Sequence, residues 1–304
     1  MLKTIVVGVD GREGGRDALA LAARLALLAG GELVAVRALP FDAYVGRGGG
    51  PNYDSLADAE AQRQVEQDLA EAGLTARTRL IADASPARAL HRMAEALDAD
   101  VIVVGSTRRG VVGGVFAGDD AAATLHASSC AVAVAPRGLA AEEWTPVNRI
   151  GVGLNASAEA HQALALAVAL AADCGASLVV RTVVAAPVAD ADRTAYDADW
   201  LERSKAGAKQ ELDEAVEDLA VEVSGDVAVG TPVDELVELS GAVDLLVVGS
   251  RAWGPVRRTL IGSTAAKLMR AAQCPVLVLP RGAATGQPGE KDPAPARAES
   301  SSAA

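Results

Sequence analysis

The sequence predicts an α/β protein made of two tandem doubly wound domains, each with a five-stranded parallel sheet. Three observations lead to this fold class. The chain has 304 residues, half of them hydrophobic, which is enough for two domains with cores of their own. A segment from the middle of the chain recurs near its end. Short apolar runs alternate with helical patterns in both halves, as they do in sheets built from strand–helix–strand units.

The repeat defines the domain organisation. Residues 100–138 align with residues 244–282 at a constant offset of 144, and 17 of the 39 positions are identical. A period of about 145 residues gives each unit room for its own core, so the repeat indicates a tandem pair and not a solenoid. The predicted boundaries are a first domain at 1–138, a linker at 139–147, a second domain at 148–282 and a tail at 283–304.

Short apolar runs mark five strands in each unit. In the first unit the expected strands are 5–9, 33–38, 76–82, 101–105 and 131–135. In the second unit they are 150–154, 178–184, 221–229, 245–249 and 276–279. The runs 101–104 and 245–248 are apolar on both faces, which is typical of strands that helices cover on both sides.

Helical patterns lie between these strands. The clearest cover residues 18–29, 55–72, 87–97, 159–174, 200–219 and 265–272. Four helices per unit are implied by the alternation. The preference for right-handed crossovers then makes an open doubly wound sheet the simplest topology.

Composition and charge exclude several classes of protein. The net charge of −12 and the pI near 4.8 leave no broad basic surface for nucleic acid or for an anionic membrane. The longest apolar run, 163–172, is about half of what crosses a bilayer. The N-terminal apolar stretch is too short for a signal peptide, so we expect a cytoplasmic protein. Three cysteines without a CxxC pair agree with a reducing compartment.

Two segments have the composition of flexible chain. Residues 283–304 lack apolar periodicity and contain several Pro, Gly and Ser residues, which predicts a disordered tail. Residues 47–51 read Arg-Gly-Gly-Gly-Pro and predict a flexible insertion after the second strand.

The loop after the fourth strand of the second unit is the first candidate site. Ligands of open α/β sheets bind beyond the carboxyl ends of the strands. There, Gly262-Ser263-Thr264 precedes a helical stretch and offers backbone N–H groups and two hydroxyls, a combination that holds phosphate. Ordinary helix capping by Ser263 or Thr264 explains the same residues. This segment alone leaves both interpretations open.

The order of several motifs resembles the universal stress protein family. The first strand ends in Val-Gly-Val-Asp-Gly, and the last has the form Cys-Pro-Val-Leu-Val-Leu-Pro. Between the fourth strand and the last helix, nucleotide-binding members of that family carry Gly-x2-Gly-x9-Gly-Ser/Thr. The resemblance covers nearly all of residues 1–282, twice. It implies parallel five-stranded sheets, dimerisation through the last strand and ATP bound by some members, and it does not imply an enzyme.

The second unit retains most of the family's nucleotide motif. Ala252 replaces the second glycine of the motif, which costs about 1 kcal/mol if that position needs a positive φ. Asn155 replaces the acid after the first strand, so it keeps an acceptor for a ribose hydroxyl and loses a charge that would help to hold Mg²⁺. Val183 matches the position whose backbone contacts adenine. The remaining residues that the resemblance assigns to this site are Val248, Gly249, Ser250, Arg251, Gly262, Ser263 and Thr264.

The first unit carries an acidic pair at the equivalent phosphate position. Asp119 and Asp120 follow Gly118, where the second unit has two hydroxyls. Two unit charges 5 Å apart interact by roughly 3 kcal/mol at an effective dielectric constant of 20, so these carboxylates would repel a triphosphate. Asp119 is also a good helix N-cap. We therefore expect the weaker site, whose residues are Asp10, Ala38, Gly105, Arg108, Gly118 and Asp119, to be self-capped and empty.

These observations lead to one interpretation and one alternative. The chain is interpreted as a non-enzymatic tandem universal stress protein that binds ATP, with Mg²⁺, mainly in its second domain and acts in stress response. The alternative is a scaffold in which both sites have decayed. Slow ATP hydrolysis is less favoured because no general base or arginine finger is placed by the sequence.

The last strands predict how the two domains meet. Residues 130–136 and 274–280 are short, apolar edge strands, and exposed edges pair. We expect a pseudo-twofold pair of domains joined through them, with a homodimer as a second way of covering such strands. Cys130 and Cys274, at the start of these strands, are expected to be small buried residues. The three histidines, His91, His126 and His161, are interpreted as structural or surface residues.

Overall fold

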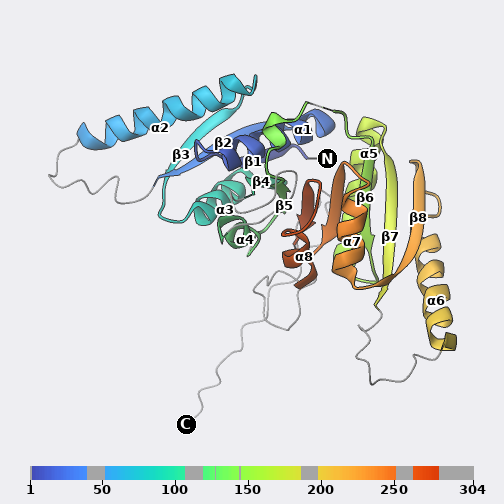
Figure 1. Cartoon of the computed structure of the whole chain (residues 1–304). Helices are drawn as coiled ribbons and strands as arrows, with labels where there is room; N and C mark the ends of the chain where they lie inside the picture. Colours follow the sequence, from blue (N-terminus) through green and yellow to red (C-terminus); the bar gives the residue numbers. More distant parts are fainter. Residues whose placement is uncertain are drawn as a thin grey trace, which may run out of the picture.

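The computed structural model describes residues 2–39, 52–106, 119–126, 128–143, 145–185, 198–250 and 263–280. Ten strands form a single sheet in the order β3-β2-β1-β4-β5-β10-β9-β6-β7-β8. Figure 1 shows the two halves beside each other, with β1–β5 in one and β6–β10 in the other. Each half is a five-stranded parallel sheet, which confirms the predicted fold class.

The elements of the first half follow the predicted alternation. Its strands are β1 (Thr4–Gly8), β2 (Glu32–Leu39), β3 (Arg77–Ala82), β4 (Val101–Gly105) and β5 (Ala131–Ala135). Its helices are α1 (Glu13–Ala29), α2 (Asn52–Glu71), α3 (Pro86–Leu97) and α4 (Asp119–Leu125). A short 3-10 turn, η2 (Leu139–Ala141), lies in the predicted linker.

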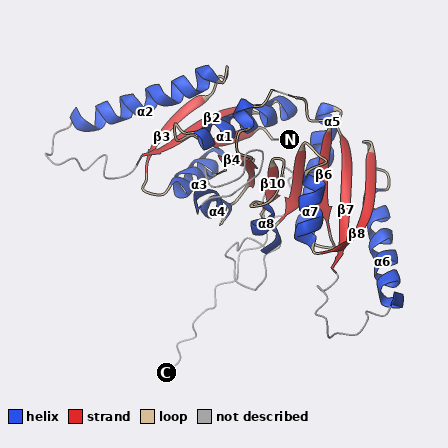
Figure 2. Ribbon diagram, in the orientation of Figure 1, coloured by secondary structure: helices blue, strands red, loops and turns tan. Residues whose placement is uncertain are grey.

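The second half repeats this order. Its strands are β6 (Arg149–Leu154), β7 (Ser177–Ala185), β8 (Val223–Gly230), β9 (Leu245–Gly249) and β10 (Val276–Leu279). Its helices are α5 (Ala158–Cys174), α6 (Ala198–Val216), α7 (Pro232–Ser240) and α8 (Ser263–Leu268). Figure 2 shows the same alternation of strands and helices by colour.

The halves are joined through their last strands. β5 and β10 pair antiparallel, with Leu277 opposite Ala133, and every other pair in the sheet is parallel. Both strands are fully buried. The predicted pairing of the two units through these strands is thus present within the chain.

Two apolar cores lie on opposite faces of the sheet. One core contains side chains from α1, α2, α5 and α6, and the other contains side chains from α3, α4, α7 and α8. Alternate residues of each central strand serve the two cores, as Val101 and Ile102 do in β4. This double cover explains why the central strands are apolar at every position.

Several predicted element ends were wrong. α1 begins at Glu13 and not at residue 18, because Gly14 and Gly15 lie inside the helix. A Cβ at Gly15 would lie 2.6 Å from Asp10 Oδ1, so the glycine serves close packing here and does not break the helix. α8 ends at Leu268 and α6 at Val216, short of the predicted residues 272 and 219. The strands 101–105, 131–135, 245–249 and 276–279 are confirmed.

Candidate functional site

The predicted site of the second half gathers residues from the carboxyl ends of three adjacent strands. β7, β6 and β9 are neighbours in the sheet. Asn155 directly follows β6, Val183 lies near the end of β7, and Gly249 ends β9 after Val248. Because the strands are parallel, these positions share one edge of the sheet, where ligands of doubly wound folds bind.

The loops that complete the predicted sites lie outside the described residues. They contain Arg251, Ala252 and Gly262 in the second half and Arg108 and Gly118 in the first. The helices that follow them are described: α8 begins at Ser263 and α4 at Asp119, two positions that are 144 residues apart. The side chains of Ser263, Thr264 and Asp119 are also outside the described set.

Asn155 and Asp10 close equivalent turns. Asn155 Oδ1 accepts a 2.9 Å hydrogen bond from the backbone N–H of Ser157, and Asp10 Oδ1 accepts a 3.0 Å bond from that of Arg12. These short-range bonds lead the chain into α5 and α1. An oxygen with two lone pairs can accept a second donor, so both side chains keep capacity for a ligand hydroxyl.

The first glycine of the motif has a packing role in both halves. A Cβ at Gly249 would lie 2.5 Å from the carbonyl carbon of Glu159 in α5. In the first half, a Cβ at Gly105 would collide with the carbonyl oxygen of Gly14 in α1. These glycines let a strand end approach the start of a helix, whether or not a ligand binds.

The serine after each of these glycines is buried. Ser250 is 3% exposed, and its backbone N–H donates to the carbonyl oxygen of Leu279 over 2.7 Å. Ser106 is 6% exposed and bonds the carbonyl oxygen of Ala135 in the same way. The amide of Ser250 is therefore already satisfied within the sheet.

A cavity of about 390 Å³ opens beside Asn155 in the second half. It lies between α5 and α6, over the ends of β6 and β7. The residues that line it are Leu154, Asn155, Ala156, His161, Thr182, Glu211, Glu214 and Ala215. Its volume falls in the range of small-molecule sites in proteins.

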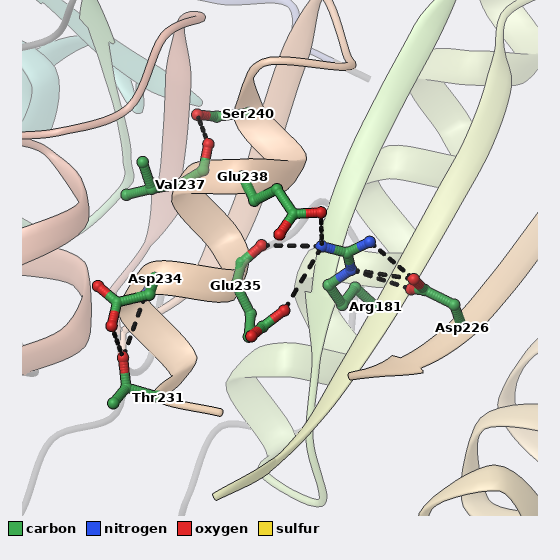
Figure 3. A network of polar contacts seen from close by, with 8 residues as sticks. All are labelled: Arg181, Asp226, Thr231, Asp234, Glu235, Val237, Glu238 and Ser240. Carbon is green, nitrogen blue, oxygen red and sulfur yellow. Dashed lines mark hydrogen bonds and ion pairs between the residues drawn. The ribbon is translucent and has the colours of Figure 1, made fainter. Parts of the chain in front are cut away.

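Thr182 faces this cavity because of its place in β7. Its neighbour Arg181 points to the opposite face, where it bonds Asp226 and the backbone carbonyl of Glu235 in α7, as Figure 3 shows. Successive strand side chains alternate between faces, so Thr182 points toward α5 and α6. Thr182 is 7% exposed, and its Oγ1 has no hydrogen-bond partner among the described residues.

The position of Thr182 is held by Arg37 in the first half. The first two strands of each half pair in one register: Ile5 with Leu33 and Ile150 with Leu178. Both pairs are related by 145 residues, and the same offset joins Arg37 to Thr182. It also joins Arg16 in α1 to His161 in α5.

The helices above the cavity align at an offset of 147. Val65 of α2 and Leu212 of α6 are each fully buried in the same core and are 147 residues apart. The register of β3 on β2 and of β8 on β7 gives the same offset. The equivalent pairs around the cavity are therefore Arg16 and His161, Arg37 and Thr182, Gln64 and Glu211, and Asp68 and Ala215.

In the first half, larger side chains occupy this position. A Cβ at Gly11 would lie 3.1 Å from Arg37 Nη1 and 3.1 Å from Gln64 Cγ, so both side chains lie over the turn that follows Asp10. Asp68 is 1% exposed. Arg37, Gln64 and Asp68 form what we call the plug.

The plug holds charges away from water. Burial raises the pKa of Asp68, against the opposing effect of the nearby Arg16 and Arg37 guanidinium groups. Neither Asp68 carboxylate oxygen, nor Arg37 Nη1, has a hydrogen-bond partner within the described residues. Ala215 and Thr182 replace these two charged residues in the second half, which leaves the cavity open.

The structure revises the interpretation of the histidines and supports that of two cysteines. His161, predicted as structural or surface, lines the cavity. The sequence signal for it was the equivalence with Arg16, which the offset of the first strands contains. Cys130 and Cys274 are buried, as expected, and burial raises their pKa values to about 11 and about 12, so neither thiol is reactive at neutral pH.

Comparison with known families now identifies the fold. The family model described as the universal stress protein family matches residues 1–136 and again residues 146–280. The chain belongs to the universal stress protein family. The two matches correspond to the two halves of the sheet.

Relatives of this universal stress protein agree with the family assignment. A universal stress protein from Mycobacterium tuberculosis (strain H37Rv) is 31% identical over 136 residues, which cover 42% of this chain and 46% of the relative. The chain thus spans about half the length of the curated relatives it matches. A universal stress protein structure from Archaeoglobus fulgidus covers 92% of this chain and 98% of its own, with a TM-score of 0.60 and 19% identity. A structure from Pseudomonas aeruginosa, a universal stress protein by its description, covers 92% and 94%, with a TM-score of 0.63 and 18% identity.

Two further searches of this universal stress protein gave negative results. Among the described residues, no helix combines the length and apolar character that crossing a membrane requires. The same residues contain no cluster of three His, Cys, Asp or Glu side chains that could hold a metal ion.

Proposed function

We propose that this universal stress protein is a non-enzymatic, cytoplasmic protein of the stress response that binds ATP in its second half. The observation that supports the proposal is the cavity beside Asn155. It lies at the edge of the sheet where doubly wound folds bind ligands, and its volume suits a base and sugar. The first half has the same turn and fills the equivalent space with the plug.

The nucleotide would lie across the ends of β7, β6 and β9. The base and ribose would enter the cavity, with the backbone of Val183 against adenine and Asn155 bonding a ribose hydroxyl. The phosphates would extend toward Ser263 and Thr264, where hydroxyls can donate to them. Asn155 carries no charge, so Mg²⁺ would be held chiefly by the phosphates themselves.

The first half would remain without nucleotide. Arg37 and Gln64 lie over the turn after Asp10. Asp119 and Asp120 stand where the second half has hydroxyl residues, and their carboxylates would repel a triphosphate. Two separate features therefore act against a ligand in this half.

A scaffold is the second candidate function. It is favoured by the internal roles of Gly249 and Ser250, which pack against α5 and bond β10 in a way that needs no ligand. In that case the paired halves would serve to bind other proteins. Because β5 and β10 already pair with each other, a homodimer would use a different surface.

Isothermal titration of ATP into the full chain, at fixed Mg²⁺ and salt, tests the proposal. The wild-type chain should bind ATP with about one nucleotide per chain. The double variant Thr182→Arg with Ala215→Asp rebuilds the plug in the second half and should lower ATP affinity at least tenfold. Circular dichroism melting shows whether the variant still folds.

A matched control adds the same two charges outside the cavity. Ala220→Arg with Ala206→Asp changes two exposed alanines and should leave ATP affinity within about twofold. No binding to the wild type at millimolar ATP would favour the scaffold. Equal affinity of wild type and plugged variant would show that nucleotide binds elsewhere.

A further inference from the structure

The cavity of the second half is rich in hydrogen-bond acceptors. Glu211 and Glu214 contribute carboxylates, Thr182 contributes a hydroxyl, and none of the described residues that line the cavity is lysine or arginine. Such a wall repels phosphate and favours a neutral or cationic group that carries hydrogen-bond donors. The part of a nucleotide that suits it is the base.

Most of the polar atoms around the cavity already have partners. Glu214 Oε1 accepts from Gln210 Nε2 over 2.8 Å. The ring Nδ1 of His161 is bonded to the carbonyl oxygen of Ser157 at 2.9 Å. Asn155 Oδ1 is bonded to the backbone N–H of the same serine.

Two groups keep unused capacity. Glu211 makes no hydrogen bond or ion pair with any described residue, and the buried Oγ1 of Thr182 also lacks a partner there. An unpaired hydroxyl in a buried wall is unfavourable, and a ligand group that pairs with it relieves this cost. Glu211 stands on α6 and Thr182 on β7, so they face the cavity from two sides.

We infer that Glu211, assisted by Thr182, recognises the exocyclic amino group of the base and so makes the second half selective for adenine. This inference rests on the proposed function. An ionised carboxylate only accepts hydrogen bonds, and adenine offers an amine donor. Hypoxanthine offers a carbonyl oxygen at the same ring position, which leaves two acceptors facing each other. Sites that read a hydrogen-bond donor reject the analogue that lacks it.

Paired titrations of ATP and inosine triphosphate into the full chain test this inference. The two ligands share the ribose and triphosphate and differ in that one group. Wild-type protein should bind ATP at least tenfold more tightly. Glu211→Gln offers both an acceptor and a donor, so the ratio of the two affinities should fall to within about threefold, chiefly through tighter binding of inosine triphosphate.

Two variants separate recognition from general charge and packing effects. Glu217→Gln removes the same charge from an exposed residue just beyond α6 and should leave the ratio unchanged. Thr182→Val keeps the side-chain volume and should weaken ATP several-fold at an unchanged melting temperature.

The outcomes distinguish this inference from the proposal on which it rests. Equal wild-type affinities for ATP and inosine triphosphate would overturn base recognition and leave ATP binding in place. An unchanged ratio in Glu211→Gln would also overturn it. No binding of either nucleotide would overturn both.

Discussion

The two halves build the same turn at the end of their first strand and surround it with different side chains. Over Asp10 in the first half lies the plug, with a buried arginine and a buried aspartate. Over Asn155 in the second half lies a cavity lined by a threonine and an alanine at those positions. The exchange replaces two opposite charges together. A duplicated site can thus be opened or closed by a balanced pair of changes while the strands keep their register.

The largest expected effect concerns the balance inside the plug. Arg37→Thr alone leaves the Asp68 carboxylate buried without its neighbouring positive charge, which should destabilise the fold by about 3 kcal/mol. Adding Asp68→Ala removes the uncompensated charge and should recover at least half of that loss. Urea unfolding of the wild-type chain, both single variants and the double variant measures the coupling. A double variant as unstable as the sum of the singles would contradict the pairing of these residues.

The contrast at the phosphate position gives the second prediction. Ser263→Asp with Thr264→Asp gives the second half the acidic pair of the first, and charge repulsion should lower ATP affinity by about 100-fold or more. The reverse exchange, Asp119→Ser with Asp120→Thr, should not weaken binding. Isothermal titration compares the two variants. Unchanged affinity after the first exchange would refute the assigned phosphate position.

The third prediction concerns the other face of the sheet, where each half carries one arginine-centred ion pair. Arg181 contacts Asp226, Glu235 and Glu238, and its side chain is only 14% exposed. Arg88 pairs with Asp83 and is 65% exposed. Arg181→Met leaves three acids together and should cost about 2 kcal/mol, more than Arg88→Met. Urea unfolding checks this order, and a larger loss in Arg88→Met would reverse the comparison.

The smallest effect is a pH dependence confined to the first half. The hydrogen bond from Arg88 holds the pKa of Asp83 at about 2, below the ordinary value of 3.8. A lowered pKa stabilises the fold above pH 4, and this contribution disappears as the pH falls toward 2. Asp83→Asn should therefore lower the melting temperature at pH 7 and leave it unchanged at pH 2. A difference that persists at pH 2 would indicate packing and not charge.

The strands could be predicted from sequence because their signal is local. The central strands β4, β5, β9 and β10 have the predicted ends, since an uninterrupted apolar run bounded by polar residues has few alternatives. The start of α1 was missed because Gly14 and Gly15 resemble helix breakers. Their role depends on the turn at Asp10 and on Gly105, which are distant in sequence.

The cavity could not be predicted for a related reason. Asn155 and Val183 were found from their places at strand ends, which the repeat reveals. Glu211 and Ala215 lie on a helix whose offset has shifted from 145 to 147, so a constant alignment pairs them with the wrong residues of α2. Only the packing of Leu212 into the core fixes which face of α6 meets the sheet.

The antiparallel junction of β5 and β10 has a consequence for how many molecules the protein can engage. All strands within a half run in one direction, and the two halves run in opposite directions, so their ligand-binding edges lie on opposite margins of the slab. A small molecule cannot bridge the two margins, and each site acts as an independent monovalent receptor. A partner protein that reads both would have to wrap around the sheet or use two separate modules, and in that arrangement the open cavity and the plug would present it with two unlike ends.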